Sequence, residues 1–284
     1  MSTWIFEPGH TEAEFRARHM MVTWVRGLFK DVHGGLELDR DHCLDATFEG
    51  EIDAAGIWTG EPACDRHLRS ADFLDVENHA EISFSGRFTE RAAETAFKGE
   101  VELTIRDVTR TVPLDIAYID EWKTPWWEGG ENKGEMRRIG FEAAARINRH
   151  DFGVSWQDDL PGGGVVVSNE IELFLDVEAI LLDDLEATGA IGYYRRSVER
   201  SQTDRYLVRA LGGVESDGNG DLDRPGRLGG RVRDGQRYEA RPIESRAARL
   251  GQHGLDRGLR RAADQGHRRP RAAGGGGPHR ARRL

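Results

Sequence analysis

Residues 138–148 read RIGFEAAARIN, and this stretch decides the fold class. Its apolar residues fall at every second position: Ile139, Phe141, Ala143, Ala145 and Ile147. Successive side chains of a β-strand point to opposite faces of a sheet, so this period predicts a strand with one buried face.

The same period recurs along most of the first 180 residues. Its apolar positions include Phe15, Ala17, Ala46, Phe48, Ile52, Ile82, Phe84, Phe88, Phe97, Val101, Leu103, Ile105, Val112, Leu114, Ile116, Tyr118, Val167, Ile171, Leu173, Leu175 and Val177. With openings near 4–6 and 34–38, the pattern predicts eight or nine strands. Strands joined only by turns form an antiparallel meander, and closure removes the exposed sheet edges. We therefore predict an all-β fold, an antiparallel barrel over residues 1–183.

Three stretches interrupt this period. Residues 20–29 and 58–75 lack the alternation, and we predict that both form short helices or caps across the barrel ends. Residues 161–164 read PGGG and predict a hairpin turn, because glycine reaches positive φ without a steric penalty.

The composition changes near residue 200. Residues 1–202 hold 21 Lys and Arg against 40 Asp and Glu, a net charge of −19, whereas the remainder holds 19 Arg against 10 acids, or +9. An acidic body repels phosphate backbones, so we expect no nucleic acid on the barrel. We predict a short helical or linker segment over 184–202, and a disordered Arg/Gly-rich tail of low complexity over 203–284.

The first ten residues, MSTWIFEPGH, have neither the cationic start nor the apolar core of an export signal, so we expect a cytoplasmic protein. No window approaches the roughly 18 consecutive apolar residues of a membrane-spanning helix. In that compartment we expect Cys43 and Cys64 to be reduced thiols.

Several motifs follow one another from Trp4 to Glu178. They are EPGHT (7–11), FRARHMMVTWVRGLF (15–29), DRHLRSADF (65–73), LTIRDVT (103–109), RIGF (138–141), INR (147–149) and DFGVSW (151–156). Together they resemble the YceI-like family of polyisoprenoid-binding proteins. The resemblance implies an eight-stranded lipocalin-like barrel, with short capping helices, whose apolar interior takes a polyisoprenoid or quinone-like lipid.

An eight-stranded barrel has room inside for packed side chains or for one slender ligand. We predict that the ligand-binding residues are Phe15, Phe84, Leu103, Ile105, Phe141, Ile147, Phe152 and Ile171. The alternative for each is an ordinary core position. Asn148, Arg149 and Asp151 are predicted to be structural, with contact to a ligand head group as the alternative.

We expect a binding or carrier protein and not an enzyme, with no cofactor and no metal, because neither a nucleophile elbow nor a dinucleotide loop is visible. The rival hypothesis is an enzyme for a small apolar substrate with His10 or His19 as base. A metal site joining these histidines to His67 or Asp65 is disfavoured by their spacing.

Two further alternatives stay open. Trp122, Trp126 and Trp127 fall in a predicted loop, 121–134, and either cover the pocket as a lid, contact a membrane transiently, or pack on the barrel wall. The barrel is also compatible with a homodimer, and with a stress-response interaction module whose interior is collapsed.

Overall fold

The computed structural model describes residues 1–30, 32–39, 42–160, 164–192 and 194 of the 284-residue chain. The strands are β1 (Ser2–Phe6), β2 (Glu12–His19), β3 (Thr23–Phe29), β4 (Val32–Leu38), β5 (Thr47–Asp53), β6 (Glu81–Arg91), β7 (Ala96–Ile105), β8 (Val108–Glu128), β9 (Glu131–Asn148), β10 (Asp159–Leu160), β11 (Gly164–Val165) and β12 (Val167–Leu181). The helices are α1 (Pro62–Arg69), α2 (Leu182–Ala187) and the 3-10 turns η1 (Cys43–Asp45), η2 (Ala54–Gly56) and η3 (Arg149–Phe152). The predicted tail over 203–284, and the part of the predicted 184–202 segment beyond residue 194, lie outside the described residues.

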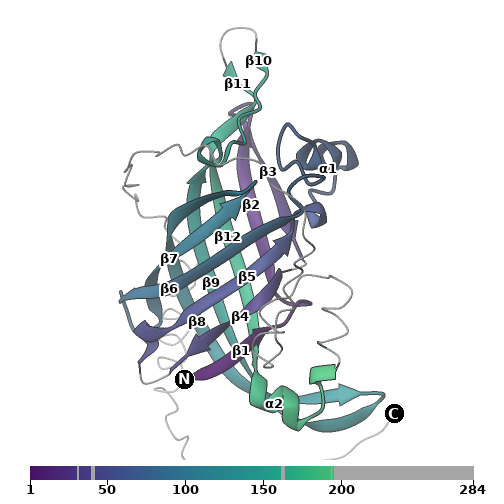
Figure 1. The fold of residues 1–284 in the computed structure, drawn as a ribbon, viewed down its shortest axis with the longest axis vertical. Coiled ribbons are helices and arrows are strands. Elements are labelled where there is room, and N and C mark those ends of the chain that lie inside the picture. Colours follow the sequence, from purple (N-terminus) through teal and green to yellow (C-terminus); the bar gives the residue numbers. More distant parts are fainter. Residues whose placement is uncertain (31, 40–41, 161–163, 193, 195–284) are drawn as a thin grey trace, which may run out of the picture. The chain divides into compact units, whose positions relative to one another are not determined.

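The main sheet closes into a barrel (Figure 1). Its order is β1-β4-β5-β6-β7-β8-β9-β12-β2-β3, and β1 also pairs with β12. β1 and β2 lie end to end along β12, since Trp4 pairs with Leu181 and Ala17 pairs with Ile171. β3 and β4 lie end to end along β2 and β1 in the same way. The ring therefore has eight antiparallel strand positions, two of them interrupted, and the predicted eight-stranded barrel is confirmed.

The alternating apolar residues face the inside of this ring. In the β9–β12 pair, Phe141 lies opposite Val177 and Ala145 lies opposite Leu173, and all four belong to or pack on the main core cluster. Because the register sets every second residue inward, one apolar face of each strand builds a continuous inner wall.

The prediction of a short helix or cap over 20–29 is wrong, because residues 23–29 form β3. Two features hide the strand period there. Gly27 takes an inward position because a Cβ at that point would lie 2.5 Å from the Phe15 ring. Trp24 lies under the guanidinium groups of Arg16 and Arg18, at 4.8 and 4.1 Å from the ring centroid. With Trp24 on the outer face and Gly27 on the inner face, the alternation of apolar and polar residues is not visible in the sequence of β3.

The predicted cap over 58–75 does contain a helix, α1. Glu61 caps its first turn by accepting a hydrogen bond from the Cys64 backbone N–H at 2.6 Å. Buried Asp65 accepts from the backbone N–H and hydroxyl of Thr59 at 2.7 and 2.6 Å. Arg69 donates to the carbonyl of Ala55 at 2.7 Å. These bonds fix α1 against one end of the barrel (Figure 1). Cys64 carries a thiol, as does Cys43.

β8 and β9 continue past the ring as a two-stranded arm, residues 119–137, in which each of the two strands pairs only with the other among the described strands. The predicted loop over 121–134 is therefore mostly β-structure with a tight turn at Gly129 and Gly130, whose φ angles are positive. Helix α2 packs between the arm and β1, forming a second apolar cluster around Met136, Ile180 and Leu185. None of the helices in the described ranges has the length and apolar character needed to cross a bilayer.

Arg137 on the arm forms an ion pair with Asp184 of α2. Its Nε and Nη2 donate to the two carboxylate oxygens of Asp184 at 2.9 Å each, and its backbone N–H donates to Oδ2 at 2.8 Å. These hydrogen bonds hold the pKa of the Asp184 carboxyl below its usual value.

We predict that Asp184→Asn lowers the free energy of unfolding by about 1 kcal/mol at pH 7, because the charge of a bidentate but partly exposed pair is lost. A carboxyl with a lowered folded-state pKa stabilises the fold above its unfolded pKa, near 4, and loses that effect as pH falls. The difference between the two proteins, measured by urea unfolding, should therefore shrink below about pH 4. Equal stability at pH 7 would show that the pair does not anchor α2.

Candidate functional site

The barrel encloses a cavity of about 250 Å³. Its wall is apolar and draws on every strand of the ring, with rings from Phe6, Phe29, Phe84, Phe88 and Phe141 among its larger groups. The Phe6 and Phe84 rings stack at 6.5 Å between centroids, and Phe141 meets Phe88 edge to face at 6.0 Å. The interior is therefore hollow, contrary to the alternative of a collapsed core.

All eight residues predicted to bind the ligand lie on this wall: Phe15, Phe84, Leu103, Ile105, Phe141, Ile147, Phe152 and Ile171. That they contact a lipid stays a prediction. The prediction omitted Phe88, although it shares the inward period of Ile82 and Phe84.

The α1 end of the cavity is lined by residues that no strand period could reveal. Leu68 comes from α1, Phe73 and Leu74 from the loop that follows it, and Val154 from the loop after η3. The His67 ring contacts the Phe73 and Trp156 rings edge to face, at 4.9 and 4.7 Å between centroids. This aromatic group packs the α1 segment over that end of the barrel, where it forms a cap.

Arg149 brings a buried charge to the wall. Its Nε donates to the Ser168 carbonyl at 3.0 Å, and its Nη1 donates to the Val154 carbonyl at 2.8 Å. Burial lowers the pKa of its guanidinium. The only other charged wall residue in the described ranges is Glu14, whose carboxylate lies 3.8 Å from Arg26 Nε. No described carboxylate pairs with Arg149, so its charge is balanced by carbonyl dipoles alone.

The family model for the YceI-like domain matches residues 4–179, more than half of the chain. The chain belongs to the YceI-like family. A UPF0312 protein of Serratia proteamaculans is 33% identical over 171 residues, which cover 60% of this chain and 81% of the relative. A UPF0312 protein of Pseudomonas fluorescens is 31% identical over 179 residues, covering 61% and 83%.

Solved structures are similar to this YceI-like chain. BcnA of Burkholderia cenocepacia aligns with a TM-score of 0.50 at 15% identity, over 61% of this chain and 98% of BcnA. A polyisoprenoid binding domain from Saccharophagus degradans aligns with a TM-score of 0.43 at 9% identity, over 63% of this chain and 98% of that domain. At these identities the likeness to BcnA shows the fold alone.

The histidines proposed as bases do not line the YceI-like cavity. His10 lies in the segment between β1 and β2 beside Glu7 and Glu178, and His19 ends β2 opposite Thr23. Neither belongs to the cavity wall. The geometry therefore gives no support to an enzyme that uses His10 or His19 on a substrate in the barrel.

The three arm tryptophans also lie outside the cavity wall. Trp122 and Trp127 are 69% and 60% exposed, whereas Trp126 packs against the α2 cluster. Figure 1 places the arm and α2 at the end of the barrel opposite α1. Trp126 therefore packs against the rest of the protein, which is one of the three alternatives from the sequence. None of the three tryptophans belongs to the cavity wall, so the lid alternative has no support from their positions.

We predict that Arg149→Met lowers the free energy of unfolding by about 2 kcal/mol, because the buried carbonyls of Ser168 and Val154 lose their donors. Arg110→Met is the matched control: exposed Arg110 donates only to the carbonyl of its neighbour Thr109, and its loss should change stability by less than about 0.5 kcal/mol. Chemical unfolding of both variants measures the difference. Similar stabilities would mean that Arg149 does not hold the β12 and η3 segments together.

Proposed function

We propose that this YceI-like barrel binds a polyisoprenoid lipid in its cavity and carries or sequesters it without covalent chemistry. The observation that carries the proposal is the cavity of about 250 Å³ inside the barrel, whose wall is apolar except near Arg149 and Glu14. A site of this kind suits a long hydrocarbon, which needs burial and few polar contacts.

The volume sets the length of chain that fits. As a rough scale, we count each non-hydrogen atom of a ligand as one water-sized sphere of about 10–15 Å³. The cavity therefore holds roughly 20 non-hydrogen atoms of a ligand, which corresponds to about four isoprene units. A longer lipid would leave part of its chain outside the wall, or widen the barrel.

The polar end of such a lipid belongs near Arg149 in this proposal. Of the two charged residues on the described wall, Glu14 has Arg26 beside it, whereas Arg149 has no oppositely charged partner among the described residues. Arg149 lies among the α1-end residues Phe152 and Val154. A hydroxyl, carbonyl or anionic group would find a donor there, while the tail runs along the apolar wall. This arrangement accommodates a prenyl alcohol as well as a prenyl quinone.

We predict that affinity grows with prenyl length until the cavity is filled. Burial of each CH₂ is worth about 0.8 kcal/mol before ordering costs, so each added isoprene unit should strengthen binding by at least about tenfold. Delipidated full-length protein is titrated with geraniol, farnesol and geranylgeraniol, and then with a much longer polyprenol, by calorimetry. The gain should stop near geranylgeraniol. Absence of binding across the series would overturn the proposal.

We predict that filling the cavity weakens this binding. Ala143→Phe adds about six non-hydrogen atoms to the wall and Phe141→Trp adds about three, so farnesol affinity should fall at least about tenfold in the first and less in the second. Ala117→Phe is the control, because Ala117 follows inward Ile116 on β8 and lies outside the wall. Thermal unfolding checks that each variant is folded. Unchanged farnesol affinity in both cavity variants would place the ligand elsewhere.

Four finer statements about ligand, membrane contact, assembly and location are also proposals. A quinone ligand would be identified by mass spectrometry of lipid extracted from protein purified from its own host. Transient membrane contact is supported by exposed Trp122 and Trp127 and is measured by vesicle co-sedimentation. A homodimer and a cytoplasmic location are proposals as well, and are checked by solution mass and by cell fractionation.

A further inference from the structure

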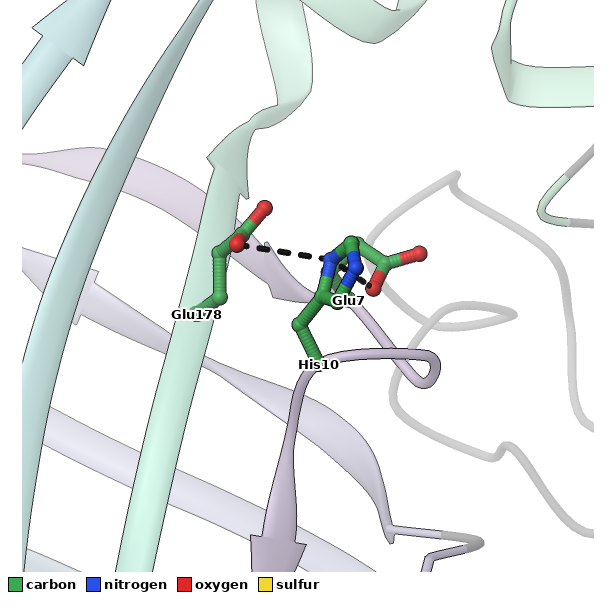
Figure 2. A group of neighbouring side chains, drawn as sticks. All are labelled: Glu7, His10 and Glu178. Atoms are coloured by element: carbon green, nitrogen blue, oxygen red, sulfur yellow. Dashed lines mark ion pairs between the residues drawn. The ribbon is translucent and has the colours of Figure 1, made fainter.

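Three metal-ligating side chains meet on the outside of the barrel, away from the cavity wall. Glu7 and His10 lie between β1 and β2, and Glu178 lies on β12 (Figure 2). His10 Nδ1 is 2.9 Å from Glu7 Oε2 and 3.4 Å from Glu178 Oε2. The three donor atoms all lie within 4.8 Å of one another.

The backbone holds these residues in place independently of their side chains. The Glu7 N–H donates to the Glu178 carbonyl at 2.8 Å, and the Thr11 N–H donates to the Glu7 carbonyl at 2.9 Å. The buried Thr11 hydroxyl donates to the Glu178 carbonyl at 3.0 Å. The segment between β1 and β2 is thus hydrogen-bonded to β12, and Figure 2 shows the His10 ring between the Glu178 and Glu7 side chains.

The Glu7 carboxylate is the group in this cluster that most favours a bound cation. It is only 8% exposed, and its buried Oε2 accepts no hydrogen bond from the described residues. The approach of His10 Nδ1 at 2.9 Å lacks hydrogen-bond geometry. Gly9 leaves the space that this carboxylate occupies, since a Cβ there would lie 3.1 Å from Oε2. A buried carboxylate oxygen without a donor is costly unless a cation faces it.

The local charges leave a place for that cation. Arg138 Nη1 pairs with Oε1 of Glu178, so Oε2 of Glu178 remains turned toward His10. Two carboxylates against one guanidinium leave one net negative charge beside Nδ1. A divalent ion bound by Nδ1 and the two Oε2 atoms would change the net charge of the group from −1 to +1. Water molecules on the ion would solvate this charge.

The spacing and the donor types indicate which ion fits. Zinc lies about 2.0–2.2 Å from nitrogen and oxygen ligands, so neighbouring ligands lie about 3.0 Å apart in an octahedron and about 3.4 Å apart in a tetrahedron. The distance from Nδ1 to Glu7 Oε2, 2.9 Å, is near the octahedral value, the distance to Glu178 Oε2, 3.4 Å, is near the tetrahedral value, and the two Oε2 atoms lie within 4.8 Å of each other. Calcium and magnesium favour all-oxygen sites, whereas an imidazole with carboxylates suits zinc. His10 is 68% exposed, so water can complete the coordination.

We propose that Glu7, His10 and Glu178 form a zinc site on the outer wall of the barrel. Because its ligands come from the β1–β2 interruption and from β12, the ion ties together two of the strands that close the ring. The site is structural, since none of its ligands lines the cavity. This inference is independent of the proposed lipid.

The test uses full-length protein freed of metal with a chelator, and Zn²⁺ alone as the probe. Calorimetry should show one equivalent bound, and the unfolding temperature should rise with Zn²⁺ concentration, as for any ligand of the native state. His10→Ala should weaken this binding at least about 100-fold and abolish the rise, because a ligand matters at least as much as its outer-shell partners. Glu7→Gln, which keeps the side-chain shape, should do the same.

His42→Ala is the matched control. His42 is exposed like His10, and among the described residues its ion pair is with Asp39, whose Oδ2 lies 3.4 Å from Nδ1, so its loss should leave the bound equivalent and the unfolding shift unchanged. Failure of the wild-type chain to bind Zn²⁺ would overturn the proposal and leave an ion pair only. Undiminished binding in both His10→Ala and Glu7→Gln would overturn it equally, by placing the ion elsewhere.

Discussion

Pairing of β12 with strands on both of its edges is the interaction on which the rest of the structure depends. β9 runs along one edge, and β1 and β2 share the other. With this closure β12 has backbone partners along both of its edges. Among the described residues, the outer edge of β3 is bridged only where Leu28 meets Trp58. The hollow, the inward apolar faces and the outer Glu7–His10–Glu178 group all follow from closure.

The size of inward side chains then decides whether the closed sheet is solid or hollow. An eight-stranded ring is narrow enough for large side chains to fill it. On β9 the inward series runs from Phe141 through Ala143 and Ala145 to Ile147, so two adjacent positions contribute only a methyl group. The stretch 138–148 thus specifies both the strand and the room beside it. The large rings of Phe84 and Phe88 line the space without closing it.

The sequence predicted what depends on local period and missed what depends on distant contacts. Alternation predicts the barrel and seven of the eight proposed wall residues, since register follows from which face is apolar, whereas Phe152 lies in η3. It failed at β3, where the Phe15 ring leaves room only for a glycine at position 27, and Trp24 lies on the outer face against the Arg18 guanidinium. For the arm the sequence predicts a loop, because Gly129, Gly130 and Gly134 are typical of loops and turns. Glu7 and Glu178 are far apart in the sequence and meet only when the ring closes, so no spacing rule could join them.

The central claim is that a hydrocarbon chain occupies the inside of this barrel. A crystal structure of the full-length protein grown with geranylgeraniol tests it most directly. We expect continuous density along the cavity, in contact with Phe141, Leu103 and Phe15, and with the hydroxyl end toward Arg149. Density for the lipid only on the outer wall, with the interior empty or closed by rearranged side chains, would contradict the claim.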